Sequence, residues 1–592
     1  MSRISIPWHL VFWLLALCLP AAGEDGDPPE EIAYRVRFRG IDDDRQKARF
    51  EGLSQAVALQ HRPPASVVLL ERRAAGDVDR FQALLKSEGY FDGTVTPSIA
   101  TTVTPARVVF EIERGPRYRL GEVELVLTDG SPARPFLDAG LEADAPVSTS
   151  VILDAERRLV RQLRDHGYPF AKAGERRVEV DHSVRRVNLL FRLEPGTEAF
   201  FGEMEIFGRN RVREKAIHKR VPWSAGDPYS ANLIDDFRKE LLSTGMFLAV
   251  NVERGDALAD DGTLPLTVRL TERKRRSAIL GLEYESDIGF GANFDWQHRN
   301  FLAREIRLDM TARVTEIELA YELQVARSRF LHPRQSLLVT FRVAEDTPDA
   351  FTSVNEELAV QVSRQLTDRL RVSGGVATKL SEVEQVDSKE NYALLLSPWA
   401  LDYNYSDNLL DPTRGGRAII EFAPYTDVRS GDLTFSRTFG EYRHYLSSER
   451  WPGIVLAGRL ALGVLSGASR SDIPADEQFY AGGGGSIRGY EYQTVGDIVD
   501  GQPIGGNSLI ETSIELRTRF GEQWGLVAFV DGGMAYESSA PRDDLSLQWG
   551  AGLGLRIFTA MGPIRVDVAV PVNPRDDLDE DYQFYLSLGQ AF

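Results

Sequence analysis

The segment Phe479–Tyr490 is the part of the sequence best suited to specific chemistry. It contains four consecutive glycines, Gly482–Gly485, followed by Ser486 and then by Ile487, Arg488, Gly489 and Tyr490. Glycine lets a backbone approach a ligand closely, so a phosphate-cradling loop is the enzyme-like interpretation. No Gly-Lys-Ser/Thr follows, and no strand-to-helix transition surrounds the segment. We therefore expect no nucleotide site here, and a merely flexible loop would not require Arg-Gly-Tyr flanked by aromatic residues.

No other group of residues is typical of a catalytic or metal centre. The eight histidines show no spacing that suits metal ligands, and no nucleophile–base signature stands out. The acids Asp402, Asp407 and Glu511 are scattered, which fits a polar interior or a loop better than a catalytic pair. We expect no enzymatic activity, no cofactor and no metal.

The N-terminal residues predict export. Residues 1–23 combine Arg3, an apolar run over Trp8–Leu19 and small residues before the acidic Glu24, which is the pattern of a cleaved signal peptide. The alternative, a membrane anchor helix, needs a longer apolar run. Cys18 is the only cysteine, so the mature chain would have no disulfide and no cysteine-ligated metal. Avoidance of cysteine fits the oxidising bacterial periplasm.

Charge and hydropathy exclude two further classes of protein, nucleic-acid binders and proteins that span a membrane with helices. The formal net charge is −19, and removing Arg3 with its acid-free signal peptide makes it −20, so nucleic-acid binding is not expected. No later stretch approaches the eighteen or so consecutive apolar residues of a spanning helix. A mature chain that spans a membrane must then do so as a β-barrel.

A repeat of 78 residues organises the N-terminal half. Gly89, Gly167 and Gly245 each follow a helical pattern of apolar residues, where glycine is typical of a left-handed helix end. Alternating, strand-like segments come next, at Arg107–Glu113, Val187–Glu194 and Leu264–Glu272. A strand, helices, a glycine and two strands predict a small α+β unit that buries one sheet face under its helices.

Short alternating segments replace the helical periodicity from residue 277 onward. One of them alternates the apolar Ile564, Val566, Val568 and Val570 with Arg565, Asp567 and Ala569. Charged residues on the second face suit a barrel that is apolar outside and polar inside. The 316 residues from 277 to 592 accommodate about 16 strands, at roughly 20 residues per strand and connection. Tyr582, Phe584 and Phe592 at the ends of the final segment match two aromatic girdles.

Taken together, these features resemble the superfamily of outer-membrane assembly factors that join POTRA domains to a β-barrel. The tip Ile487, Arg488, Gly489 and Tyr490 matches the Arg-Gly-Tyr/Phe tip of that family's sixth extracellular loop, and the three repeats match POTRA domains. The resemblance implies a signal peptide at 1–23, POTRA domains at 24–116, 117–196 and 197–273, and a transmembrane antiparallel β-barrel at 277–592. The expected fold is three α+β POTRA modules followed by a barrel of about 16 strands.

In that family the loop folds back into the barrel, where its arginine pairs with acids on the inner wall. The resemblance carries this role to Arg488, with Glu515 and Asp531 as its acceptors. The planar fork of an arginine suits carboxylates, although desolvation opposes the attraction of a buried pair. Whether Arg488 only braces the barrel or also acts directly in client insertion stays open at this point.

The resemblance also implies a lateral gate. The first barrel strand is expected at Ser277–Asp287 and the last at Gln583–Phe592, and in the family these two strands pair over a short, weak seam. The gate residues are Leu280, Leu282, Leu586, Leu588, Gly589 and Phe592. Gly589 has no side chain to pack, which would weaken pairing near the chain end.

Within the superfamily, three POTRA units resemble most closely the TamA subgroup, the outer-membrane subunits of the translocation and assembly module. The chain would then help insert or secrete client β-barrel proteins such as autotransporters, from the bacterial outer membrane with its POTRA domains in the periplasm. Its partners would be a TamB-like inner-membrane-anchored protein, client outer-membrane proteins and the lipid bilayer. The alternatives are a central barrel-assembly factor, a two-partner-secretion transporter, and a passive pore with periplasmic docking domains.

Overall fold

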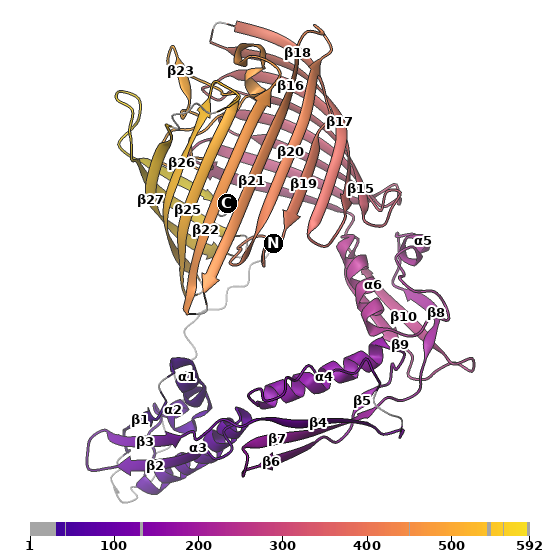
Figure 1. Cartoon of the computed structure of the whole chain (residues 1–592), viewed down its shortest axis with the longest axis vertical. Coiled ribbons are helices and arrows are strands. Elements are labelled where there is room, and N and C mark those ends of the chain that lie inside the picture. Colours follow the sequence, from indigo (N-terminus) through magenta and orange to yellow (C-terminus); the bar gives the residue numbers. More distant parts are fainter. Residues whose placement is uncertain are drawn as a thin grey trace, which may run out of the picture. The chain divides into compact units, whose positions relative to one another are not determined.

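The computed structural model describes residues 31–41, 43–130, 134–386, 388–448, 450–521, 523–540, 546–559, 562–588 and 592. The predicted signal peptide and the predicted gate residue Gly589 lie outside these residues. Three small α+β units precede one large sheet (Figure 1). No helix in the described ranges is long and apolar enough to cross a membrane.

The first α+β unit follows the predicted order of elements. It consists of β1 (Tyr34–Arg39), α1 (Asp44–Leu53), α2 (Gln55–Ala58), α3 (Val67–Ser87), β2 (Thr94–Ala100) and β3 (Ala106–Glu113). In the sheet β1-β3-β2, strand β1 runs parallel and β2 antiparallel to β3. Helix α3 buries Phe81 against Phe110 of β3, and Gly89 follows the helix at φ +91°, as the sequence predicts.

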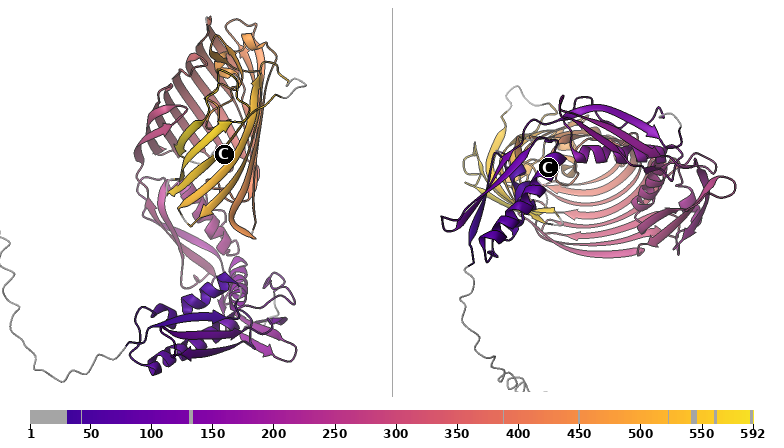
Figure 2. Two further views of the ribbon diagram at one scale, coloured as in Figure 1. Left: turned by 90° about the vertical axis from the view of Figure 1, so that its left-hand side faces the viewer. Right: turned by 90° about the horizontal axis from the view of Figure 1, so that it is seen from below.

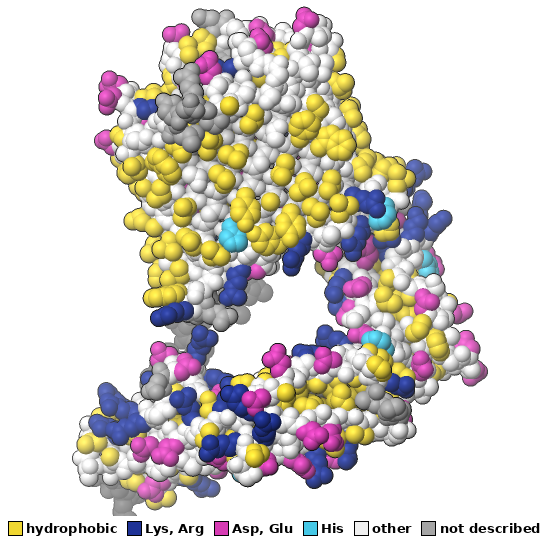
Figure 3. Space-filling model, viewed as in Figure 1, with side chains coloured by type: hydrophobic (Ala, Val, Ile, Leu, Met, Phe, Trp, Pro, Cys, Tyr) yellow, Lys and Arg dark blue, Asp and Glu magenta, His cyan; other side chains and the backbone are white. Residues whose placement is uncertain are grey.

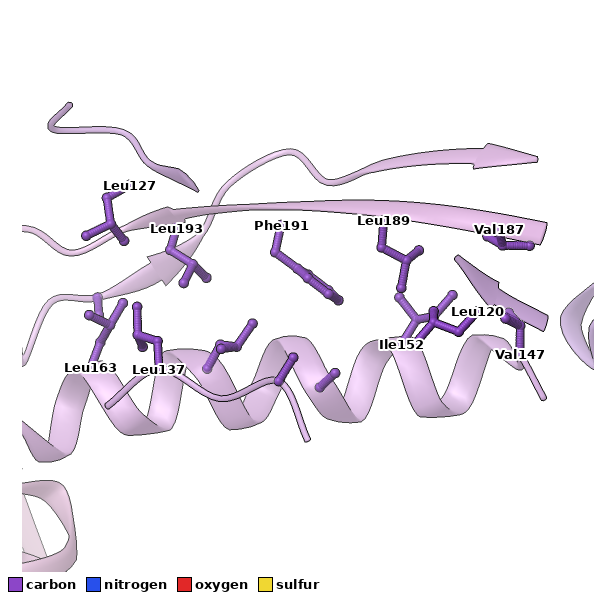
Figure 4. Packing of buried hydrophobic residues seen from close by; sticks show 14 of the residues in the cluster. Leu120, Leu127, Leu137, Val147, Ile152, Leu163, Val187, Leu189, Phe191 and Leu193 are labelled. Carbon is purple, nitrogen blue, oxygen red and sulfur yellow. The ribbon is translucent and has the colours of Figure 1, made fainter. Parts of the chain in front are cut away.

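The second α+β unit shows how its core forms. It consists of β4 (Arg119–Leu127), α4 (Thr149–Asp165), β5 (Lys172–Ala173), β6 (Arg177–Asp181) and β7 (Arg186–Glu194), with sheet order β4-β7-β5 and β6 also paired to β7. Helix α4 directs Ile152 and Leu163 toward Leu189, Phe191 and Leu193 of β7 (Figure 4). Full burial of such a side chain contributes about 1.5–3 kcal/mol. The hydroxyl of Ser148 caps α4, and Gly167 follows it at φ +97°.

The third α+β unit repeats this order. It consists of β8 (Phe200–Phe207), α5 (Glu214–His218), α6 (Ala231–Ser243), β9 (Phe247–Arg254) and β10 (Thr263–Glu272), with sheet order β8-β10-β9. Gly245 has φ +68°. The three strands predicted after the repeat glycines are confirmed, because they lie within β3, β7 and β10. The bounds proposed for the three domains stay predictions.

A single carboxylate holds the loop before α5 in this unit. The Oε1 atom of Glu272 accepts hydrogen bonds from the backbone N–H groups of Asn210, Arg211 and Val212 at 2.9, 2.8 and 2.9 Å. Burial raises the pKa of Glu272, but the three N–H donors outweigh it and the pKa is lowered overall. A lowered carboxyl pKa means that the charged form stabilises the folded loop.

We expect Glu272→Gln to weaken the loop by about 1 kcal/mol at pH 7, because hydrogen bonds to a charged acceptor are the stronger ones. Hydrogen exchange at residues 210–212 of the full chain should accelerate several-fold. The difference from the wild type should be complete above pH about 4.5 and vanish as the pH falls through the lowered folded pKa. The control is Glu253→Gln, whose side-chain partners Asn251 and Arg269 are both exposed. Equal acceleration in both variants would contradict this role of Glu272.

In the part of the chain that the structure describes, the C-terminal sheet has 17 strands and is antiparallel throughout. They are β11 (Arg276–Glu285), β12 (Gly289–Phe301), β13 (Ile306–Val314), β14 (Glu318–Ser328), β15 (Gln335–Asp346), β16 (Thr352–Gln365), β17 (Leu370–Gln385), β18 (Ser388–Leu396), β19 (Trp399–Asn404), β20 (Gly415–Asp427), β21 (Thr434–Ser448), β22 (Trp451–Ser466), β25 (Ser508–Phe520), β26 (Trp524–Tyr536), β27 (Gln548–Thr559), β28 (Gly562–Pro571) and β29 (Gln583–Leu588). Because β18 and β19 both lie between β17 and β20, the described strands occupy 16 positions. The sheet curves round until its two end strands, β11 and β29, lie next to each other (Figure 2).

The two faces of this sheet have the polarity of a membrane barrel. On β25, Ile514 is 59% exposed and points outward, whereas its neighbours Ser513 and Glu515 are buried inside. Hydrophobic side chains cover much of the outer face in the view of Figure 3. In a water-soluble sheet the apolar face would be the buried one, so this inverted pattern indicates a lipid-facing exterior around a polar interior.

Candidate functional site

The loop between β22 and β25 packs inside the barrel. It contains two short 3-10 helices, η1 (Arg470–Asp472) and η2 (Ala475–Glu477), and a small hairpin of β23 (Asp497–Val499) and β24 (Gln502–Ile504). Ile487 and Tyr490 near its tip are fully buried, in one apolar cluster with Leu465, Leu509 and Ala535 of the barrel strands. The loop is therefore a packed part of the barrel interior.

Arg488 is the electrostatic centre of this loop, and its side chain is only 2% exposed. Its Nε lies 2.6 Å from Oδ2 of Asp531, and its Nη2 donates to Oδ1 of the same carboxylate at 2.9 Å. Its Nη1 lies 2.8 Å from Oε1 of Glu515 and 3.0 Å from Oδ2 of Asp567. The guanidinium also stacks on Phe529, 3.4 Å from the ring centroid. The bidentate contact uses the planar fork of an arginine, which lysine lacks.

The structure thus brings Arg488 together with both predicted acceptors, Glu515 and Asp531, and adds Asp567 of β28. Three more arginines complete the cluster: Arg517 pairs with Glu515, and Arg556 and Arg565 pair with Asp567. Taking so many charges out of water is costly, and mutual pairing is what makes their burial tolerable. We name these three carboxylates and four guanidinium groups the Arg488 cluster.

Backbone contacts fix the rest of the tip. The N–H of Gly489 donates to the hydroxyl of Tyr585 on β29 at 3.0 Å, and that hydroxyl donates to the carbonyl of Tyr490 at 2.8 Å. A Cβ atom on Gly550 of β27 would lie 1.7 Å from the carbonyl oxygen of Arg488. Glycine in the barrel wall at residue 550 is therefore what allows the loop backbone to come this close.

A second anchor holds the beginning of the loop. The Nζ of Lys379 on β17 lies 2.8 Å from Oδ2 of Asp476 and 2.6 Å from Oε1 of Glu477. Ser353 on β16 donates a hydrogen bond to Asp476 at 2.9 Å. Because the wall residues of the Arg488 cluster lie on β25, β26, β27 and β28, the loop is fixed to two separate parts of the barrel wall.

The sequence interpretation missed Asp567, Tyr585 and Lys379. Asp567 carried a usable signal, because it alternates with valines on β28 and so had to face the interior. The alternation does not say which inward residue meets the loop. That depends on how the strands close into a barrel, which residue spacing does not encode.

The predicted gate corresponds to the two end strands of the sheet. Leu280 and Leu282 of β11 are 75% and 86% exposed on the outer face, and Leu586 of β29 is half-buried. In the described residues, β11 pairs only with β12 and β29 only with β28, whose register with β29 ends at Leu588. We call this boundary between β11 and β29 the seam.

The described part of the expected last strand is β29, which ends at Leu588, and residues 589–591 lie outside the described residues. Phe592 is buried against Tyr445 of β21 and Ala457 of β22. The Nη2 of Arg517 donates to its carbonyl oxygen at 3.0 Å, and the guanidinium stacks on its ring at 4.9 Å. Phe592 is therefore held inside the barrel by Arg517 and Tyr445. The aromatic-girdle interpretation did not anticipate this position.

Comparison with known proteins agrees with this geometry. The model of the Omp85 superfamily domain matches residues 242–592, and a POTRA model, the surface antigen variable number repeat, matches residues 199–273. Outer membrane protein assembly factor BamA of Nitratidesulfovibrio vulgaris is 23% identical, over 88% of this chain and 68% of its own length. BamA of Neisseria meningitidis serogroup B is 21% identical, over 88% of this chain and 73% of its own length.

The fold also has a solved counterpart. The crystal structure of BamA from Haemophilus ducreyi lacking POTRA domains 1–3 superimposes with a TM-score of 0.65 at 16% identity, over 80% of this chain and 100% of that chain. At this identity the likeness shows the fold alone. The Omp85 match, in contrast, covers more than half of the chain. The chain therefore belongs to the Omp85 superfamily, as an outer-membrane β-barrel protein with a periplasmic POTRA region.

Proposed function

We propose that the chain is an outer-membrane assembly or translocation factor that inserts or secretes client β-barrel proteins such as autotransporters. The observation that carries this proposal is the seam, where β11 and β29 lie next to each other without a paired register among the described residues. The relatives named outer membrane protein assembly factors support the same function.

The mechanism follows from unpaired strand edges in lipid. An open seam exposes backbone N–H and C=O groups of β11 and β29 to hydrocarbon, where each unsatisfied group costs several kcal/mol. A client strand that pairs with an exposed edge removes this cost by β-augmentation. Strand addition at the seam can then template a new barrel beside the bilayer. This mechanism relies on strand pairing and uses no catalytic residue.

The filled interior favours this function over a passive pore. The loop is fixed to β17 through Lys379 and to β26 through Arg488, so its packed core lies inside the barrel. A loop packed in this way takes up space in the water-filled channel that a passive pore requires.

We also propose membership of the TamA subgroup, with a TamB-like inner-membrane-anchored partner. The support is the number of α+β units, each of which has sheet edges that suit β-augmentation. A pull-down with the full chain distinguishes the alternatives. Recovery of a large periplasm-spanning protein supports the subgroup, and recovery of small lipoproteins alone favours a central barrel-assembly factor.

Reconstitution tests the function itself. Full-length protein in liposomes should accelerate the folding of an autotransporter β-domain roughly tenfold over empty liposomes, which corresponds to about 1.4 kcal/mol of activation free energy. Liposomes containing an unrelated barrel of similar size control for disturbance of the bilayer. A large steady ion conductance together with unchanged client folding would instead support the passive pore.

A further inference from the structure

Gly484 contacts both ends of the barrel sheet. Its N–H donates to Oδ2 of Asp287 at 2.5 Å, and Asp287 lies in the turn between β11 and β12. Its carbonyl oxygen accepts from Nη2 of Arg565 on β28 at 3.0 Å. One residue of the loop is therefore hydrogen-bonded both to the first hairpin of the barrel and to its penultimate strand, β28, on the other side of the seam.

The last strand contributes to the same place. The ring of Tyr585 on β29 would lie 2.9 Å from a Cβ atom at Gly484, and its hydroxyl binds the backbone of Gly489 and Tyr490. The inner side of the seam is thus covered by the loop, between Asp287 on one strand pair and Tyr585 on the other. Asp287 is half-buried, so its hydrogen bond to Gly484 is partly shielded from water.

The glycines of the run Gly482–Gly485 differ in how strictly the contact with Asp287 and Tyr585 requires a residue without a side chain. A Cβ atom on Gly483 would lie 2.8 Å from Oδ2 of Asp287, and Gly483 has φ +99°. At Gly484 a Cβ atom would be crowded by Tyr585 and Asp287, whereas at Gly485 it would meet nothing within 4 Å. A Cβ atom on Gly482 would instead lie 2.5 Å from the carbonyl oxygen of Glu491 in the same loop, so only Gly483 and Gly484 are crowded from the side of the seam.

We propose that Gly483 and Gly484 form a strap that holds the seam closed from inside, with Asp287 as its positioning residue on the first hairpin. This inference rests on the proposed use of the seam as a gate. Strand pairing across the seam is missing in the described residues, so the backbone of Gly484 provides a link that a ladder would otherwise provide.

The strap couples the loop to the gate. The Arg488 cluster fixes the tip to β25, β26 and β28, and the glycine run extends that fixation to the first hairpin. Movement of the loop away from the wall must break the hydrogen bond to Asp287, so the seam is freed when the loop moves. Gate opening and loop displacement are then one event.

The test measures the width of the seam directly. Spin labels at Leu282 and Phe584, both exposed on the outer face, report the distance between β11 and β29 in full-length protein in liposomes. We expect Asp287→Ala and Gly484→Ala each to raise the ratio of long to short distances roughly tenfold, because both lose the hydrogen bond to a charged group. The first variant removes the carboxylate, and the second displaces the backbone N–H by crowding against Tyr585 and Asp287. Asp287→Asn, which keeps the size of the side chain, should raise it less.

Gly485→Ala is the matched control and should leave the distance distribution unchanged. Folding of each variant is verified by its heat-modifiable migration on gels, and Asp287→Asn provides a second route if Gly484→Ala does not fold. Unchanged distances in folded Asp287→Ala and Asp287→Asn would overturn the strap, as would an equal change in Gly485→Ala. Because this readout needs no client, loss of client folding without a change in distance would count against the strap and leave the assembly function standing.

Discussion

Replacing Arg488 by alanine is expected to destabilise the barrel by about 3–5 kcal/mol, because it leaves a carboxylate buried without its cation. Asp531 is the group affected most. Among the described residues its remaining side-chain partner is the hydroxyl of Ser513. Glu515, in contrast, keeps Arg517, and Asp567 keeps two other arginines of the cluster. Urea unfolding in detergent should show this loss as a lower midpoint, and client folding by the variant in liposomes should slow by at least tenfold.

Two further variants make the result specific. Adding Asp531→Asn to Arg488→Ala should recover a large part of the lost stability, because it removes the uncompensated charge. Arg470→Ala, in the same loop, is the control: its partners Asp497 and Glu537 are exposed, so it should cost at most about 1 kcal/mol. Equal stability of Arg488→Ala and the wild type would contradict the cluster as described.

The same variants separate the two roles left open for Arg488. If the arginine only braces the barrel, the double variant that regains stability should regain client folding in proportion. If the arginine takes part in insertion, stability returns and client folding stays slow. The comparison works because Asp531→Asn restores charge balance without restoring the planar fork that holds the loop tip in place.

Local patterns explain why the α+β units were predictable. A helix end at Gly89 depends on a left-handed conformation within a few residues, and a strand such as β7 depends on alternation along its own length. Both are properties of neighbouring residues. The strand count was predictable for a related reason, since bilayer thickness fixes the length of each strand. The interruption between β18 and β19 was not visible in this way.

Long-range contacts explain what the sequence could not show. Glu515 and Asp531 were predicted through family resemblance, whereas Asp287 and Tyr585 take part because barrel closure brings the first hairpin beside the last strand. Phe592 ends the chain with the aromatic residue expected of a girdle, yet it lies inside, where Arg517 attracts it. In each case the deciding partner is far away in the sequence.

Locking the seam is expected to reduce client folding to below about a tenth of the wild-type rate, because both strand edges would stay unavailable for β-augmentation. Cysteines at Leu280 or Leu282 of β11, each combined with one at Leu586 of β29, would provide the lock. Both β11 positions are used because no ladder fixes the register across the seam among the described residues. Cys18 is the only native cysteine, so the engineered pair faces no competing thiol within the barrel.

Reduction should restore client folding, which separates locking from misfolding. The control pair is Leu280→Cys with Phe294→Cys, because these residues are directly opposite each other in the β11–β12 ladder. A disulfide there joins strands that are already paired, so client folding should be unaffected. If the locked seam supports client folding at the wild-type rate, clients do not use the edges of β11 and β29. The loop would then only fill and stabilise the barrel interior, because the contacts of Gly483 and Gly484 would not control a gate.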